Sequence, residues 1–176
     1  CTAGYYQPLT EQLRCYSCMM GSYSTTGSSS CTDCPAGKFQ NSIASSECID
    51  CSAGYYQAQT GQTGCDNVCP TGTYSTAGST TCTDCEAGKY APNTQSSSCT
   101  ICPTGRYADV ITSTSCSFCT DLTFASTTGS IQCTDCACRG RKGADSCDIQ
   151  TGQCECKPLF YNSNGKQTEK SDVDNV

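Results

Sequence analysis

One phrase of sequence decides the fold, and residues 34–51, "CPAGKFQNSIASSECIDC", contain a complete copy of it. Cys34 opens the phrase, Gly37 and Phe39 follow, and Cys48 and Cys51 close it. Glycine at this place suits a turn with positive φ, which other residues adopt only at a cost. The aromatic ring is the largest apolar side chain of the unit, so we expect it to pack against a disulfide.

The phrase returns at a period of 17 residues. Pairs of the form C-x2-C begin at residues 15, 31, 48, 82, 99, 116 and 133, and a C-x3-C variant joins 65 and 69. We call each loop from the second cysteine of one pair to the first cysteine of the next a module. The eight modules are residues 1–15, 18–31, 34–48, 51–65, 69–82, 85–99, 102–116 and 119–133. Such repetition is typical of units that stack because none can bury a core alone.

Seven modules carry both the glycine and the aromatic residue, and the eighth has Leu122 in place of glycine. The glycines are Gly4, Gly21, Gly37, Gly54, Gly72, Gly88 and Gly105. The aromatic residues are Tyr6, Tyr23, Phe39, Tyr56, Tyr74, Tyr90, Tyr107 and Phe124. The segments between are short and rich in Ser, Thr and Gly, so we expect short β-hairpins and loops with almost no helix.

The composition requires a restraint other than an apolar core. The 176 residues include 21 Cys, whereas Leu, Ile, Val and Phe together number only 18. A chain so poor in apolar side chains cannot offset the conformational entropy of folding by burial alone. Cysteine at this density is typical of a disulfide scaffold. We therefore predict an elongated disulfide-rich rod.

The cysteines also place the protein in an oxidising compartment, extracellular or at the cell surface. The net charge of -6, with only 10 Lys and Arg, argues against nucleic acid or anionic lipid as a partner. No apolar run has the length of a membrane-spanning helix, and we expect no membrane insertion in this segment. The start at Cys1, without a leader, is typical of a mature fragment.

The phrase C-x-x-G-x-[YF]-x7-8-C followed by x2-C resembles the tandem ephrin-receptor-like cysteine-rich repeats of large extracellular proteins. It is also similar to the first type of module in tumour necrosis factor receptor ectodomains, but the four-cysteine modules usual in those receptors are not interleaved here. This resemblance covers residues 1–135. It implies a disulfide from the first to the last cysteine of each module. The implied pairs are Cys1 with Cys15, Cys18 with Cys31, Cys34 with Cys48, Cys51 with Cys65, Cys69 with Cys82, Cys85 with Cys99, Cys102 with Cys116, and Cys119 with Cys133.

Residues 136–157 have a different spacing. "CACRGRKGADSCDIQTGQCEC" at 136–156 resembles an incomplete laminin-type EGF-like module. That resemblance implies the pairs Cys136 with Cys147 and Cys138 with Cys154, and it leaves Cys156 unpaired or bonded between chains. The polar tail, residues 158–176, is expected to dock on a neighbouring subunit, since alone it should fray.

Other kinds of site fit the residues less well. Successive C-x2-C pairs also fit a zinc ribbon, but the chain has no His and keeps one period throughout. A redox C-x-x-C would need a thioredoxin-like scaffold, which the pattern lacks. Without His, and with acidic residues scattered singly, no catalytic constellation can be assembled. "CTDC" recurs at 31, 82 and 133, where Asp is a turn residue in preference to a calcium ligand. We expect no enzyme, no cofactor and no metal.

Ser and Thr number 48. Their runs form solvated turns, and some hydroxyls could carry O-linked sugars. The candidates are Thr25, Thr26, Ser28, Thr76, Thr80 and Thr127.

Two functions remain open from the sequence. The first is an extracellular structural protein, in which the rod self-associates into a homopolymeric filament, a surface fibre or a matrix; mastigoneme-like flagellar hairs are one such setting. The alternative is the ectodomain of a receptor or adhesion protein that binds a protein ligand along the rod. A ligand site should break the repeat with exposed aromatic and Arg side chains, and the least regular module is 119–133.

Overall fold

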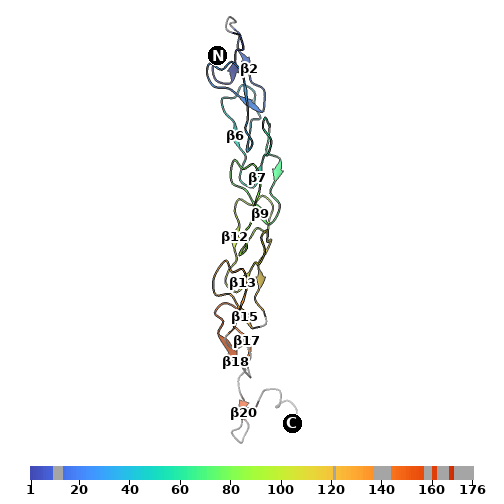
Figure 1. The fold of residues 1–176 in the computed structure, drawn as a ribbon, viewed down its shortest axis with the longest axis vertical. Helices are drawn as coiled ribbons and strands as arrows, with labels where there is room; N and C mark the ends of the chain where they lie inside the picture. The colour runs from blue at the N-terminus through green and yellow to red at the C-terminus, as the bar shows by residue number, and fades with distance from the viewer. Residues whose placement is uncertain (10–13, 121, 137–143, 157–159, 162–166, 169–176) are drawn as a thin grey trace. The chain divides into compact units, whose positions relative to one another are not determined.

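The computed structural model describes residues 1–9, 14–120, 122–136, 144–156, 160–161 and 167–168. Within these residues the only regular secondary structure is β-strand, and no helix is present. The strands pair in twos, and Figure 1 shows them as short arrows joined by long loops. The predicted fold class, a disulfide-rich array of hairpins, is confirmed.

Each module forms one hairpin with the residues that separate it from the next module, and each strand of the hairpin has two residues. The pairs in modules 1 to 4 are β1 (Tyr5–Tyr6) with β2 (Tyr16–Ser17), β3 (Ser22–Tyr23) with β4 (Thr32–Asp33), β5 (Lys38–Phe39) with β6 (Ile49–Asp50), and β7 (Tyr55–Tyr56) with β8 (Asn67–Val68). The pairs in modules 5 to 8 are β9 (Thr73–Tyr74) with β10 (Thr83–Asp84), β11 (Lys89–Tyr90) with β12 (Thr100–Ile101), β13 (Arg106–Tyr107) with β14 (Ser117–Phe118), and β15 (Thr123–Phe124) with β16 (Thr134–Asp135).

The repeated phrase explains this hairpin directly. The first strand holds the aromatic residue and the residue before it, and the second strand is the pair of residues between two cysteines. In module 5, for example, Tyr74 stands opposite Thr83 and Thr73 opposite Asp84. The disulfide between Cys69 and Cys82 closes the intervening loop. Strand pairing and disulfide therefore hold the same loop shut.

Four further strands follow the repeats. β17 (Ala144–Cys147) pairs antiparallel with β18 (Cys154–Cys156), with an irregularity between Ala144 and Ser146. β19 (Phe160–Tyr161) pairs with β20 (Gln167–Thr168).

By its internal contacts the chain divides into two units whose sequences interleave. Unit 1 comprises Cys1–Glu86, Tyr90–Thr100 and Ile111–Ser115, and unit 2 comprises Ala87–Lys89, Ile101–Val110 and Cys116–Val176. In unit 1 the disulfides are Cys1–Cys15, Cys18–Cys31, Cys34–Cys48, Cys51–Cys65, Cys69–Cys82 and Cys85–Cys99. In unit 2 they are Cys102–Cys116, Cys119–Cys133 and Cys136–Cys147.

The core of both units consists of sulfur and small side chains. The first cysteines of modules 2 to 7, Cys18, Cys34, Cys51, Cys69, Cys85 and Cys102, are fully buried, at 0% exposure. The aromatic rings are only half-buried. The largest fully buried side chains are these six cysteines and two serines, Ser24 and Ser75, so the rings are less buried than the sulfur atoms beside them in the sequence pattern.

Candidate functional site: the interface between modules

The turn that begins each module brings its glycine to the interface. In module 5 the amide of Thr73 donates to the Pro70 carbonyl, and Gly72 has φ +79 at the third position of this turn. A positive φ at that position defines a type II turn, where glycine is favoured. The predicted reason for the glycine is therefore present.

The structure adds a second reason, which is close approach of two backbones. A Cβ atom built on Gly72 would lie 2.1 Å from the carbonyl oxygen of Thr112, two modules further along the chain. A Cβ on Gly21 would lie 2.2 Å from the carbonyl oxygen of Gly61, again two modules along. No side chain fits at these distances, so glycine is required even apart from its φ.

Leu122 shows what relaxes this requirement. It occupies the glycine position of module 8 and keeps a positive φ of 61. The repeated phrase ends at Cys136, so the sequence supplies no module two places further on. Leu122 therefore belongs to a module that lacks the partner, two modules further on, whose carbonyl approaches Gly72 and Gly21.

Neighbouring modules are joined by three backbone hydrogen bonds that recur at every interface, each within one of the two units. In the first set, the glycine amide donates to the carbonyl of the residue after the next aromatic, at 2.7–3.0 Å. These bonds are Gly4 to Ser24, Gly21 to Gln40, Gly37 to Gln57, Gly54 to Ser75, Gly72 to Ala91, Gly88 to Ala108 and Gly105 to Ala125.

In the second set, the residue after the aromatic donates its amide to a loop carbonyl of the next module, at 3.0–3.2 Å. These bonds are Gln7 to Ser28, Ser24 to Ser45, Gln40 to Gln62, Gln57 to Ser79, Ser75 to Ser96, Ala91 to Ser113 and Ala108 to Ser130. In the third set, a loop amide donates back to the cysteine that opens the previous module, at 2.8–3.0 Å. These bonds are Gly27 to Cys1, Ala44 to Cys18, Gly61 to Cys34, Gly78 to Cys51, Gln95 to Cys69, Thr112 to Cys85 and Gly129 to Cys102.

These bonds satisfy backbone groups that the tight packing removes from water. Because every donor and acceptor is main chain, the interface tolerates many side chains and can be repeated without change. The stacking of modules is therefore a property of the phrase, whatever residues fill the loops.

The residue after the aromatic is a structural position that the sequence reasoning missed. It is Gln40 and Gln57 in two modules, Ser24 and Ser75 in two others, and Ala91 in a fifth, and all five are buried. The Gln40 amide nitrogen donates to the Glu47 carbonyl at 2.8 Å, which ties down the loop of its own module. The signal was available, because aligned modules show only Gln, Ser or Ala here.

The serine variants make a different bond. The Ser24 hydroxyl donates to the Tyr5 carbonyl at 3.1 Å, and the Ser75 hydroxyl donates to the Tyr55 carbonyl at 2.9 Å. Each bond reaches the preceding module. Within this buried position, therefore, Gln holds a loop whereas Ser adds a contact between modules.

The loop amide of the third set belongs to a residue in the left-handed region. Four of the modules place glycine there, but Ala44, Gln95 and Thr112 have φ of 57, 61 and 59. A β-branched residue such as Thr112 is the least suited to this conformation. The hydrogen bond from the Thr112 amide to the Cys85 carbonyl, at 2.8 Å, holds it there.

In unit 2, the segment after the repeats takes the place of a ninth module. The Ala125 amide donates to the Ile149 carbonyl at 2.9 Å, as the equivalent amides donate to the next module elsewhere. Gly152, with φ +72, lies against the Phe124 ring. The disulfide from Cys136 to Cys147 attaches this loop to the array. Residues 148–153 therefore cap module 8, in the manner of the terminal units of other repeat proteins.

The capping loop is shaped by its first residue. Asp148 accepts hydrogen bonds from the amides of Thr151 at 2.7 Å and Gln150 at 2.9 Å. These bonds, with that from Thr151 first, lower the pKa of the Asp148 carboxyl below its ordinary value of 3.8. The charged form of Asp148 thus favours the loop conformation that presents Ile149.

The cysteines predicted from the two resemblances lie as follows. The structure joins all eight module pairs, with Cα–Cα distances of 5.6–5.8 Å, and also joins Cys136 to Cys147. Cys138 lies outside the described residues, as does most of the tail 158–176, so the pair with Cys154 and the docking of the tail remain predictions. The state of Cys156 likewise remains a prediction.

The predicted glycosylation residues occupy exposed turns. Thr25, Thr26, Thr76, Thr80 and Thr127 are exposed, whereas Ser28 is half-buried and donates its hydroxyl to the Thr25 carbonyl at 2.8 Å. The Thr25 and Ser28 hydroxyls also lie 3.3 Å apart. This is the hydrogen bonding of a solvated turn.

The described part of the chain contains neither a metal-binding cluster nor a membrane-spanning helix. Among those residues, no group of three or more His, Cys, Asp or Glu side chains could hold a metal ion. None of the described segments forms a helix able to cross a membrane.

A comparison with protein families shows the family to which the repeats belong. The family described as "Tyrosine-protein kinase ephrin type A/B receptor-like" matches residues 21–52, 43–74 and 72–119. The chain belongs to this ephrin-receptor-like family. Its matched segments are cysteine-rich repeats, and no catalytic domain is evident in them. A search of curated proteins found no match.

Ephrin-receptor-like repeats held by this many disulfides are typical of extracellular proteins. Together they point to an extracellular, oxidising location for the chain.

Proposed function

We propose that this ephrin-receptor-like array is part of an extracellular structural protein, in which it serves as a spacer and as a subunit of a filament, surface fibre or matrix. The observation that carries the proposal is the repeated set of main-chain bonds between disulfide-closed modules. An interface that depends little on side chains can be extended to any length. The array also resists unfolding, because a disulfide closes the loop of each module.

The partner in this proposal is another copy of the chain. Loop 148–153 already covers the stacking amide of Ala125. Copies that associate would therefore meet through surfaces other than this end of the repeats, such as the exposed second strands β4, β6 and β10. O-linked sugars on the exposed threonines would add stiffness and protection to the fibre.

Electron microscopy of native material isolated without reductant tests the proposal. Long regular filaments that contain this chain would support it. Analytical ultracentrifugation of the purified chain is the companion measurement, and a monomer at every concentration, together with isolated particles in the micrographs, would contradict it. Intact-mass analysis of the same material would detect the sugars as added hexose units. If Thr26 and Thr76 carry these sugars, the added mass should disappear when both residues are replaced by Ala.

A second function, a receptor or adhesion ectodomain, is favoured by one observation in unit 2. Phe118 and Ile131 are exposed there, and the Arg106 guanidinium carbon lies 3.6 Å from the centre of the Phe118 ring. Exposed aromatic and Arg side chains are enriched in protein interfaces. A soluble partner recovered with single, unpolymerised chains would favour this function over the first.

A further inference from the structure

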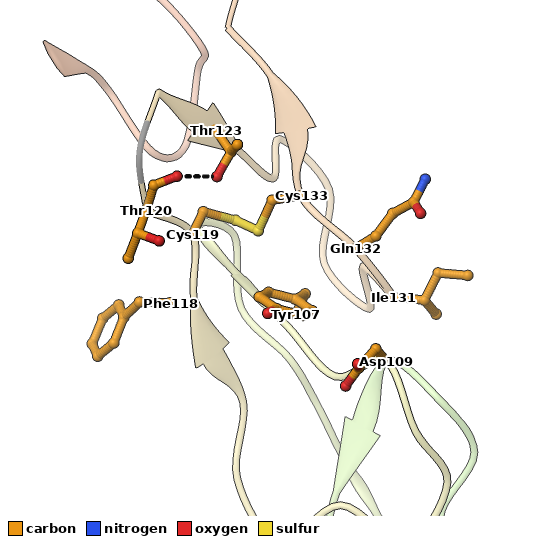
Figure 2. Close-up of a pocket in the computed structure, with 9 residues that line it drawn as sticks. All are labelled: Tyr107, Asp109, Phe118, Cys119, Thr120, Thr123, Ile131, Gln132 and Cys133. Carbon is orange, nitrogen blue, oxygen red and sulfur yellow. Dashed lines mark hydrogen bonds between the residues drawn. A yellow bond between two sulfur atoms is a disulfide. The ribbon is translucent and has the colours of Figure 1, made fainter. Parts of the chain in front are cut away.

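A groove in unit 2 is a candidate binding site, which a spacer would not require. Its volume is 640 Å³, and it is lined by residues of modules 7 and 8 and by Phe118, which lies between these modules in the sequence. Figure 2 shows the Tyr107 ring near the centre, beside the Cys119–Cys133 disulfide, with Phe118 and Ile131 to its two sides. The Tyr107 ring and the disulfide therefore lie centrally in the lining, whereas the Phe118 ring points away from Tyr107 (Figure 2).

Two large apolar side chains at the groove are exposed. Phe118 is 56% exposed and Ile131 is 53% exposed. The strand position of Phe118, just before the second cysteine of a pair, is occupied by Asp in four other hairpins and by Val68 and Ile101 in two more; the four are Asp33, Asp50, Asp84 and Asp135. Among the eight hairpins, Phe118 is thus the one aromatic side chain at this position.

The Phe118 ring is also fixed in advance. It stands directly opposite Arg106 in the β13–β14 hairpin, and the guanidinium lies over its face. An Arg106 side-chain nitrogen donates to the Cys116 carbonyl at 3.4 Å, which holds the guanidinium in place. A side chain that is ordered before binding loses less entropy when a ligand arrives.

The charged side chain that lines the groove is an acid. Asp109 is exposed at one end, and no Lys or Arg of the described residues forms an ion pair with its carboxylate. With a net charge of -6, the whole chain attracts cations over anions.

A Lys or Arg side chain is the complement of these features. Its cationic head can pair with the Asp109 carboxylate, and its aliphatic stem can lie on Ile131. A cation over the Tyr107 ring gains a further attraction. An acidic peptide or a nucleic acid would instead be repelled by the Asp109 carboxylate.

We propose that this groove binds an extended basic segment of a protein, with a Lys or Arg side chain inserted between Tyr107 and Asp109. Gln132, also in the lining, supplies an amide that can bond to the main chain of such a segment. The site does not depend on whether the array forms filaments.

Titration of the oxidised chain with a short capped peptide containing Arg and Lys tests the proposal, monitored by the NMR amide shifts of Tyr107, Asp109 and Phe118. The matched probes are the same peptide with Gln in place of both basic residues, and maltotriose. We expect saturable shifts with the basic peptide alone, weakened by salt. The substitution Asp109→Asn should weaken binding about five- to tenfold, the effect of losing about 1 kcal/mol of charge pairing.

The control variant is Asp84→Asn, which removes an exposed carboxylate from the module 5 hairpin, outside the groove. It should leave the affinity within twofold. Equal losses in the two variants would show general charge attraction and overturn the proposal. Equal binding of the Gln peptide, binding of maltotriose instead, or no shifts at all would also overturn it.

Discussion

Reduction of single disulfides under tension should lengthen the chain in steps whose size is fixed by the pairing. We consider one molecule held at both ends at constant force, with a small phosphine reductant in the buffer. Each module disulfide keeps its loop out of the load-bearing path. When the bond is reduced, the loop joins the path and the molecule lengthens.

The structure sets the step. The bond from Cys85 to Cys99 spans 14 residues and its Cα atoms lie 5.7 Å apart. Fourteen residues extend to about 49 Å at roughly 3.5 Å each, so removing the 5.7 Å already spanned leaves a gain of about 43 Å. The modules closed over 13 residues, such as Cys69 to Cys82, should give about 40 Å.

Optical tweezers resolve such steps. Over the eight module disulfides we expect eight events that total about 340 Å at full extension. The double variant Cys85→Ala, Cys99→Ala should lose one event and begin about 43 Å longer. Bonds within C-x2-C pairs would release only about 5 Å each, and bonds between distant modules would release far more, so either result would refute the pairing.

Three further predictions concern the interface, each measured by NMR hydrogen exchange on oxidised protein. Gly72→Ala adds a Cβ 2.1 Å from a carbonyl oxygen and should reduce local protection by at least about 2 kcal/mol. Gly27→Ala has a similar φ but no atom within 4 Å of the added Cβ, so it should cost only the strain of a positive φ, about 1–2 kcal/mol. Equal effects of the two substitutions would disprove the close approach. Thr112→Gly should instead raise protection, by about 1 kcal/mol, because it relieves a left-handed β-branched residue; a decrease would contradict the assigned strain. Because the folded pKa of Asp148 is lowered, its contribution to the stability of the loop is present above the unfolded value of 3.8 and is lost as pH falls through the lower folded value. Protection of the Ala125 amide, corrected for intrinsic exchange, should therefore fall in acid in the wild type. The variant Asp148→Asn should lose this pH dependence.

The hairpins were predictable because their determinants are local. The spacing from Gly37 to Phe39 and from Cys48 to Cys51 fixes a turn, a strand, a loop and a second strand within 18 residues. The positive φ of the glycines was likewise expected from the turn. A short-range pattern therefore carries most of the fold.

What could not be predicted depends on how one module meets another. The close approach of Gly72 to the Thr112 carbonyl joins residues 40 positions apart in the sequence, and no feature of either residue indicates this pairing. The capping role of Ile149 was hidden because residues 148–153 break the 17-residue period and lack the repeated phrase.

The most direct test of the account compares the hydrogen exchange of interface amides before and after reduction without denaturant. If sulfur bridges take the place of an apolar core, the amides of Gly72, Ala91 and Thr112 should be protected in the oxidised protein and exchange at nearly random-coil rates once the thiols are reduced and alkylated. Retained protection in the fully reduced protein would show that other interactions hold the modules together.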